Sequence, residues 1–372
     1  MNFSISKRIL YNNLTIVSRA ISGVAPVPSL SGVKIDVLVD ELVLTGSDSN
    51  ISIKANIKKN EENKLLIEEE GSIVIDAKYI LEIVRKIDSD IVTFDTIDGT
   101  FTLIKGEKAE FKMNGMRAKD YPDIDFDMAS EPFKMNTKIF TDIVKQTAFA
   151  CSDKETRPAL TGVNFKASGN ELVCNATDSY RLATKKINLE EAQEFDFTIS
   201  SKVLSEIATI TANKEDFMMV IDNTKLFILS DNILVRTRLI EDAYPDTSRL
   251  IPPSFTQTLE INSKDLTDAI DRTSFIKSDG KNVVKMSINS ETLEITSYNQ
   301  EIGSSHEVLP VISFNGNPIN ISCSGKYLCD ALKAIGKETV ILSFSGELRP
   351  IIINAKDSND LIQLISPVRT YN

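Results

Sequence analysis

Residues 157–165 read R-P-A-L-T-G-V-N-F, and residues 171–182 read E-L-V-C-N-A-T-D-S-Y-R-L. An upstream stretch resembles them at a constant separation of 130 residues. The matching residues are Pro28, Leu30, Gly32, Val33, Glu41, Leu42, Val43, Asp48 and Ser49 with Pro158, Leu160, Gly162, Val163, Glu171, Leu172, Val173, Asp178 and Ser179. Because one offset holds across several predicted strands and turns, the chain contains a repeat of domain size.

Each copy of the repeat combines helical and strand-like patterns. Apolar residues spaced by three and four predict helices over 6–20, 76–87 and 137–151, and others that begin at Ser200, Ser263 and Ser324. Alternating apolar residues between them predict short strands with one buried face, among them separate strands at 162–167 and 171–175. A polar loop is expected between Glu61–Glu62 and Glu68–Glu70. Tyr-Pro-Asp closes the first copy at 121–123 and the second at 244–246, and in the diverged third copy Asn299 takes the place of Asp178.

These patterns predict an α+β fold. We expect three repeated domains over residues 1–126, 127–250 and 251–372, each with two helices packed on antiparallel sheets.

Composition limits the possible classes of protein. The 372 residues are 42% hydrophobic and 26% charged, which is typical of a globular protein. No run approaches the ~18 apolar residues of a membrane span, and the N-terminus has no signal-peptide layout. The four cysteines form no C-x-x-C pair, so we expect reduced thiols and a cytoplasmic location.

No motif argues for catalysis, a metal or a cofactor. The single histidine, His306, lies in a polar stretch without a second ligand, and no phosphate-binding glycine motif occurs. Asp123, Asp125 and Asp127 imitate a calcium loop but lack its glycine and glutamate, so we expect a solvated turn. Asp178 is expected to hydrogen-bond its own turn. Two alternatives stay open: an acidic hydrolase that uses a carboxylate pair, and a repeat scaffold that binds only proteins.

Charge is distributed unevenly between the elements. The net charge is −11, but the six predicted helices sum to +6, which leaves −17 for the rest of the chain. A positive helix layer beside a negative shell suits a phosphate backbone on one side of the protein and repels it on the other.

The combination of T-D-S-Y-R-L, R-P-A-L-T-G-V, Y-P-D and the final S-P-V-R resembles the bacterial sliding clamp, the beta subunit of DNA polymerase III, over the whole chain. The resemblance implies a non-catalytic processivity factor of DNA replication. It implies a head-to-tail homodimer that closes a ring of six similar domains around double-stranded DNA, without sequence preference. The implied partners are the replicative polymerase, the clamp loader and other proteins with a clamp-binding motif.

The resemblance also assigns residues to DNA and to the dimer. Positions that match DNA contacts are Lys78, Lys154 and Lys202, and helix position adds Lys7, Arg8, Arg85 and Lys86. The seam between two copies would join Phe111 and Met113 to Phe275 and Ile276 of the partner chain. Val24 stands in a loop where the family often has a basic or polar residue.

A cleft between the second and third domains is the implied docking site for partner peptides. The matching positions are Leu160, Thr177, Tyr180, Arg181, Leu182, Pro245, Arg249, Leu250, Tyr327, Pro350, Leu364, Ile365, Pro367, Val368 and Arg369. Tyr180 replaces the usual His and Ser366 the usual Met, so we expect a reshaped pocket. Thr370, Tyr371 and Asn372 extend slightly beyond the usual end.

Overall fold

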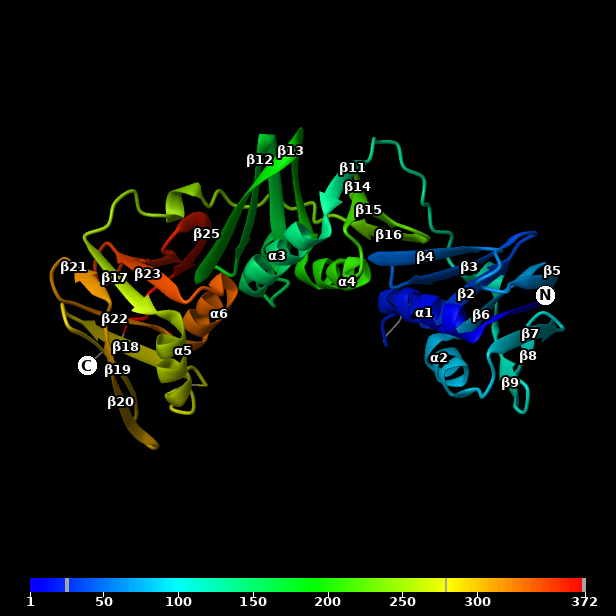
Figure 1. Ribbon diagram of the computed structural model, residues 1–372, viewed down its shortest axis with the longest axis horizontal. Coiled ribbons are helices and arrows are strands. Elements are labelled where there is room, and N and C mark those ends of the chain that lie inside the picture. Colours follow the sequence, from blue (N-terminus) through cyan, green and yellow to red (C-terminus); the bar gives the residue numbers. More distant parts are fainter. Residues whose placement is uncertain (24–26, 278–279, 370–372) are drawn as a thin grey trace. The chain divides into compact units, whose positions relative to one another are not determined.

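The computed structural model describes residues 1–23, 27–277 and 280–369, so Val24 and residues 370–372 lie outside the described part (Figure 1). The fold is α+β, as predicted. The α-helices of the described residues are α1 (Lys7–Val17), α2 (Ala77–Lys86), α3 (Thr137–Thr147), α4 (Ser201–Thr211), α5 (Ser263–Arg272) and α6 (Gly325–Ile335). Short 3-10 turns include η1 (Ser18–Ala20), η4 (Ala148–Ala150) and η5 (Pro158–Thr161).

Within the described residues, the strands pair antiparallel in four sheets. The first contains, in order, β5 (Leu66–Glu69), β1 (Asn2–Ser6), β7 (Ile91–Ile97), β8 (Phe101–Lys105) and β9 (Glu110–Asn114). The second contains β10 (Met116–Arg117), β6 (Gly71–Asp76), β2 (Gly32–Val37), β3 (Glu41–Ser47), β4 (Ile51–Lys58), β16 (Ile233–Arg238), β15 (Lys225–Ser230), β14 (Asp216–Asp222) and β11 (Phe133–Asn136). The third contains β12 (Gly162–Thr177), β13 (Arg181–Ser200), β25 (Ser358–Ile365), β24 (Ile351–Ala355), β23 (Thr339–Phe344), β17 (Gln257–Asn262) and β21 (Ser313–Asn315). The fourth contains β20 (Gly303–Pro310), β19 (Thr292–Asn299), β18 (Val283–Ile288) and β22 (Ile319–Ser324).

The chain divides into two compact units, which share the middle repeat. Residues 1–140 and 205–239 form the first unit, and residues 141–204 and 240–372 form the second. In the first unit β4 pairs with β16, and in the second unit β13 pairs with β25. Each of these pairings joins strands of two successive repeats in one sheet, so the middle repeat contributes strands to both units.

The six helices begin and end close to their predicted positions. Their apolar faces are buried, and four starts are capped by side chains. The Asp76 carboxylate accepts hydrogen bonds from the backbone of Lys78 and Tyr79, Asn136 Oδ1 accepts one from Ile139 at the start of α3, and Asn262 and Ser324 cap α5 and α6. Ser6 takes the N-cap position of α1, but its side chain makes no cap hydrogen bond.

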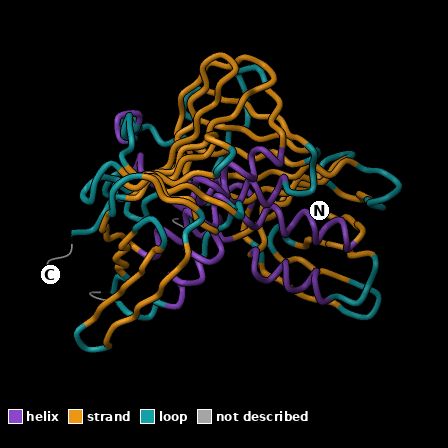
Figure 2. The backbone as a smooth tube through the Cα atoms, turned by 60° about the vertical axis from the view of Figure 1, so that its left-hand side comes forward, coloured by secondary structure: helices purple, strands orange, loops and turns teal. Residues whose placement is uncertain are grey.

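Two parts of the strand prediction were wrong. Separate strands were expected at 162–167 and 171–175, but both belong to β12, which pairs along its length with the 20-residue β13. The two form a long hairpin (Figure 1; strands are orange in Figure 2). The expected polar loop near Glu68 contains the edge strand β5, whose register is set by β1 rather than by a local apolar pattern.

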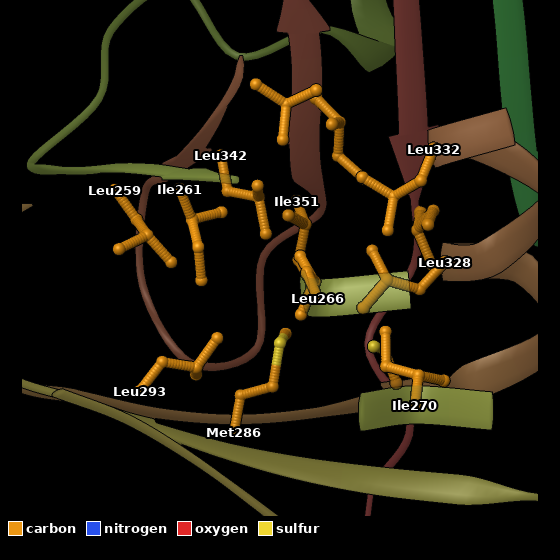
Figure 3. Close-up of a cluster of buried hydrophobic side chains, with 14 of the residues drawn as sticks. Leu259, Ile261, Leu266, Ile270, Met286, Leu293, Leu328, Leu332, Leu342 and Ile351 are labelled. Carbon is orange, nitrogen blue, oxygen red and sulfur yellow. The ribbon is translucent and has the colours of Figure 1, made fainter. Parts of the chain in front are cut away.

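The core of the third repeat lies between its helices and two sheets (Figure 3). Leu266 and Ile270 of α5 meet Leu328 and Leu332 of α6. The sheets contribute buried side chains from β17, β23 and β24 on one side and from β18 and β19 on the other, namely Leu259, Ile261, Leu342, Ile351, Met286 and Leu293. Packing of this kind fixes both α5 and α6, which line the site described below.

The residue that marks the repeat has the same structural role in all three copies. Asp48 Oδ1 accepts hydrogen bonds from the backbone N–H groups of Asn50 and Ile51, both at 2.9 Å. Asp178 Oδ1 does the same for Tyr180 and Arg181 at 2.9 and 3.0 Å, and Asn299 does so for the two equivalent residues of its turn. The expectation that Asp178 hydrogen-bonds its own turn is confirmed.

We expect Asp48→Ala to lower the free energy of unfolding by about 1–2 kcal/mol, because two backbone donors lose a charged acceptor. Ser49 follows at φ 79°, a conformation that the turn must stabilise. Thermal or urea unfolding measures the change. Asp48→Asn keeps the acceptor, as Asn299 does in the third copy, and should restore most of the stability; equal loss in both variants would contradict this role.

Candidate functional site

The pairing of β13 with β25 brings several residues of the predicted cleft together within the second unit. Arg181 lies opposite Ile365, and Leu182 lies opposite Leu364. The ladder continues past both strands, because the Ser366 N–H donates to the Tyr180 carbonyl at 2.9 Å. Tyr180 and Ser366, the two positions at which the resemblance implied a reshaped pocket, are therefore hydrogen-bonded neighbours.

Arg181 is the centre of a polar cluster. Its Nε donates to Asp178 Oδ2 at 3.0 Å, its Nη1 to Asp330 Oδ2 at 2.7 Å, and its Nη2 to the Phe149 carbonyl at 2.6 Å. The guanidinium also lies over the rings of Tyr327 and Phe149, 4.3 and 5.2 Å from their centroids. Its side chain is only 10% exposed. Arg181 thus ties the Asx turn to α6 and to η4, and holds Tyr327 in place.

The remaining cleft positions divide into a buried base and an exposed surface. Leu182 and Leu364 pack with Ile352 in a small apolar cluster. Leu160, Thr177 and Ile365 are also buried. Tyr327, Pro350 and Pro367 are half-buried, while those most open to a partner are Tyr180, which is 64% exposed, Pro245, Arg249, Leu250, Val368 and Arg369.

A cavity of about 680 Å³, here called the α5–α6 cavity, adjoins this surface. Tyr180, Tyr327, Ser366, Pro367 and Val368 line one part of it. The rest comes from residues that the sequence analysis did not single out, among them Asp271, Ser274, Lys277, Lys326, Cys329 and Lys333. For those on α5 and α6, helical spacing is the signal in the sequence, while Ser274 and Lys277 lie beyond the end of α5 and have none. Burial raises the pKa of Cys329 to about 11, so this thiol is neutral at pH 7 and is no nucleophile.

The predicted DNA contacts fall into two groups. In the first unit α1 packs beside α2, and together these helices carry Lys7, Arg8, Lys78, Arg85 and Lys86. Several of these charges have intramolecular partners: Arg8 pairs with Glu62 at 2.7 Å, and Arg85 and Lys86 pair with Glu82 at 2.8 and 2.9 Å. Hydrogen bonds from the two cations lower the pKa of Glu82 to about 2, so it stays charged.

The Lys7 ammonium donates to the Ile87 carbonyl at 2.6 Å, beside the end of α2. Lys78 has no ion pair among the described residues. In the second unit Lys154 and Lys202 are exposed, in the loop after η4 and in the first turn of α4.

The predicted seam residues lie on or near sheet edges. Phe111 and Met113 are half-buried on β9, a free edge of the first sheet. Phe275 is 65% exposed just beyond α5, whereas its neighbour Ile276 is 3% exposed and packs inside its own chain. The exposed β20 forms a free edge of the fourth sheet.

The other polar residues considered for chemistry are on the surface. His306 is exposed on β20, with Nε2 3.4 Å from Glu294 Oε2. Asp125 pairs with Lys225 at 2.6 Å, and Asp123 and Asp127 are exposed in the same segment. No group of His, Cys, Asp or Glu suited to a metal ion occurs within the described residues. No helix of that part has the length and apolar character to cross a bilayer.

Known proteins match this sequence over the whole chain. The N-terminal, central and C-terminal domain models of the DNA polymerase III beta subunit match residues 1–125, 134–246 and 248–369. The beta sliding clamps of Bacillus subtilis (strain 168) and Staphylococcus epidermidis (strain ATCC 35984) are 38% and 37% identical to this chain, and each comparison covers 100% of both chains.

The fold is similar to solved clamp structures. The DNA polymerase sliding clamp of Bacillus subtilis has a TM-score of 0.95 at 38% identity and full coverage of both chains. The DNA polymerase III beta chain of Streptococcus pneumoniae has a TM-score of 0.96 at 36% identity, covering 99% of this chain and 100% of that one. The chain therefore belongs to the DNA polymerase III beta subunit family, the beta sliding clamps, which are non-catalytic processivity factors of DNA replication.

Proposed function

We propose that two copies of this protein close a ring around double-stranded DNA in the cytoplasm. The ring slides without sequence preference and tethers the replicative polymerase, the clamp loader and other partners through the cleft around Arg181. In this proposal the three domains are residues 1–126, 127–250 and 251–372. The family assignment gives no support to the hydrolase or to a scaffold that binds only proteins.

The observation that carries the proposal is the order of strands at the junctions between repeats. At the first junction the second sheet runs β6-β2-β3-β4-β16-β15-β14-β11. The fourth sheet runs β22-β18-β19-β20, so β20 is its free edge. The first sheet, taken from its own free edge, runs β9-β8-β7-β1. Pairing β20 of one copy with β9 of the next would give the same eight-strand order. Two copies then have two such seams, and the head-to-tail ring closes.

The side chains at these edges support the same pairing. An unpaired strand edge with apolar side chains is a ready site for another chain. Phe275, Tyr298 and Val308 are exposed in the third repeat, and Phe111 and Met113 are half-buried on β9. In the proposed seam Phe275 makes the contact directly, while Ile276 supports it from within its own chain.

For DNA, we propose that the contacts are Lys7, Arg8, Lys78, Arg85, Lys86, Lys154 and Lys202. The contacts are phosphate contacts, which carry no sequence information and let the protein slide.

Lys78→Gln is expected to reduce the slope of log affinity against log salt concentration by about 1 for each copy that contacts a phosphate, and so by about 2 when both copies of the ring do, because each phosphate contact releases a counterion. Arg8→Gln should reduce it less, since Arg8 already pairs with Glu62 at 2.7 Å. Fluorescence anisotropy with a labelled duplex over a salt series measures both slopes. An unchanged slope for Lys78→Gln would remove this residue from the DNA surface.

Small-angle X-ray scattering of the purified protein tests the ring. We expect twice the chain mass of 41.2 kDa and the distance distribution of a hollow particle. A compact monomer at all concentrations would contradict the ring, and with it the proposed mode of holding DNA.

A further inference from the structure

The α5–α6 cavity has walls that differ from the apolar cleft beside it. On α6, Lys326, Cys329, Asp330 and Lys333 line the cavity, and their spacing places them on one face of the helix. The facing wall is the second half of α5 and the residues after it, including Asp271, Ser274 and Lys277. The two helices pack beside each other, so the walls are fixed by the core of the third repeat.

The α6 wall carries positive charge without a partner. The Asp330 carboxylate is already bound by the Arg181 guanidinium at 2.7 Å. Among the described residues, neither Lys326 nor Lys333 has an ion pair. On α5, in contrast, Lys264 pairs with Asp268, and Arg272 pairs with Glu307 at 2.7 Å. Lys277 and Lys281 also line the cavity and have no ion pair among the described residues. In a chain with a net charge of −11, four lysines and one carboxylate, that of Asp271, thus line one cavity without an ion pair in the described part of the chain.

The cavity also has apolar surface and is continuous with the cleft. Tyr327, Val283 and Val368 line it beside the lysines. Residues Ser366–Val368 are anchored on both sides, by the Ser366 N–H to the Tyr180 carbonyl and by the Val368 N–H to the Ser322 carbonyl at 2.7 Å. A peptide that crosses this segment leaves the cleft and meets the lysines. Apolar surface among the charges favours a peptide over a phosphate backbone, which offers no apolar group.

We propose that the α5–α6 cavity binds acidic residues that flank the apolar anchors of a partner peptide. This inference rests on the proposed function, because it needs the anchors to occupy the neighbouring cleft. Lys326 and Lys333 supply the attraction, and Tyr327 and Val368 contact the stems of the acidic side chains. The cavity then selects among clamp-binding proteins by the charge next to their anchors, and the selection weakens as salt rises.

The test compares two fluorescein-labelled peptides that carry the clamp-binding segment of the host's replicative polymerase. Their anchors are identical, and their flanking residues are all Glu in one and all Gln in the other. We expect the Glu peptide to bind several-fold more tightly at low salt. Lys326→Gln and Lys333→Gln should each reduce that preference by roughly two- to fivefold, the usual range for exposed ion pairs. The affinity of the Gln peptide should stay nearly constant.

Lys337→Gln is the matched control, since this exposed lysine lies just past α6 and does not line the α5–α6 cavity. It removes the same charge and should leave the preference unchanged.

Equal affinity of the two peptides would overturn the inference alone, because the cleft would still bind its anchors. If Lys326→Gln, Lys333→Gln and Lys337→Gln all lower the preference equally, the inference is also overturned, because long-range electrostatic attraction would then explain the preference without the cavity. Reduced DNA affinity with an intact preference would assign the lysines to DNA instead. Loss of binding by both peptides to the unmodified protein would contradict the proposed cleft and the inference with it.

Discussion

Replacing Phe275 with Asp is expected to turn the proposed dimer into monomers. The side chain is 65% exposed in the single chain and lies beside the proposed seam. Burial of a phenylalanine contributes about 2–3 kcal/mol, and a carboxylate in the same apolar contact adds a desolvation cost. A head-to-tail ring has two identical seams, so one substitution acts twice. The total of about 4–6 kcal/mol raises the dimer dissociation constant by roughly a thousandfold or more.

Analytical ultracentrifugation over a concentration series measures this change. Tyr79→Asp is the matched control, because Tyr79 is also an exposed aromatic residue but lies on α2. It should leave the mass at twice that of one chain. An intact dimer for Phe275→Asp would place the seam elsewhere. Extension by the polymerase on long templates should become distributive with the monomeric variant, since an open clamp does not enclose DNA.

Arg181→Ala should weaken binding of the polymerase peptide by at least about tenfold and leave the dimer intact. Removal of the guanidinium takes a charged donor away from Asp178 Oδ2, from Asp330 Oδ2 and from the Phe149 carbonyl, although Asp178 Oδ1 keeps its two backbone donors. It also frees Tyr327, whose ring lies 4.3 Å from the guanidinium. Breaking such a buried arrangement costs about 3 kcal/mol in protein stability. Deletion from Pro367 onward should weaken the same binding, because it removes part of the cavity wall.

Arg249→Ala separates this role from a general loss of charge. Its side chain is 91% exposed, and its nearest carboxylate atom, on Asp246, is 3.7 Å away. Any loss of peptide affinity with normal protein stability would therefore report direct contact. Titration of a labelled peptide, together with thermal unfolding, measures both quantities for each variant. Unchanged peptide affinity for Arg181→Ala would remove the cluster from the docking site.

The helices were predictable because their signals are local. Apolar spacing and a capping side chain such as Asp76 or Asn262 act within a few residues of each other. Strand pairing between repeats was not predictable from pattern, because β4 and β16 are joined by hydrogen bonds between residues far apart in the chain. The same alternation fits many partners, and only the assembled sheet selects one.

The site shows the same division. The turn at Asp178 followed from its repetition, and the resemblance placed Leu182 and Leu364, which pair across β13 and β25, in one cleft. The partners of the guanidinium, Phe149 and Asp330, carry no sequence signal, because they are brought to it by η4, which packs on β12 and β13, and by α6, which packs on β25. The lysines of the α5–α6 cavity were similarly hidden among the ordinary surface positions of a helix.

The sharing of the middle repeat between two units has a consequence for synthesis on the ribosome. The first unit includes residues 205–239, so β4 cannot pair with β16 until long after residue 126 has left the ribosome. Until then β4 has an open edge and carries the apolar Ile51, Ile53 and Ile57. Non-local pairing of this kind slows folding and leaves nascent chains prone to aggregation. A chain truncated after its first repeat would keep that edge open permanently, so the repeats are not independent folding units that fold one after another.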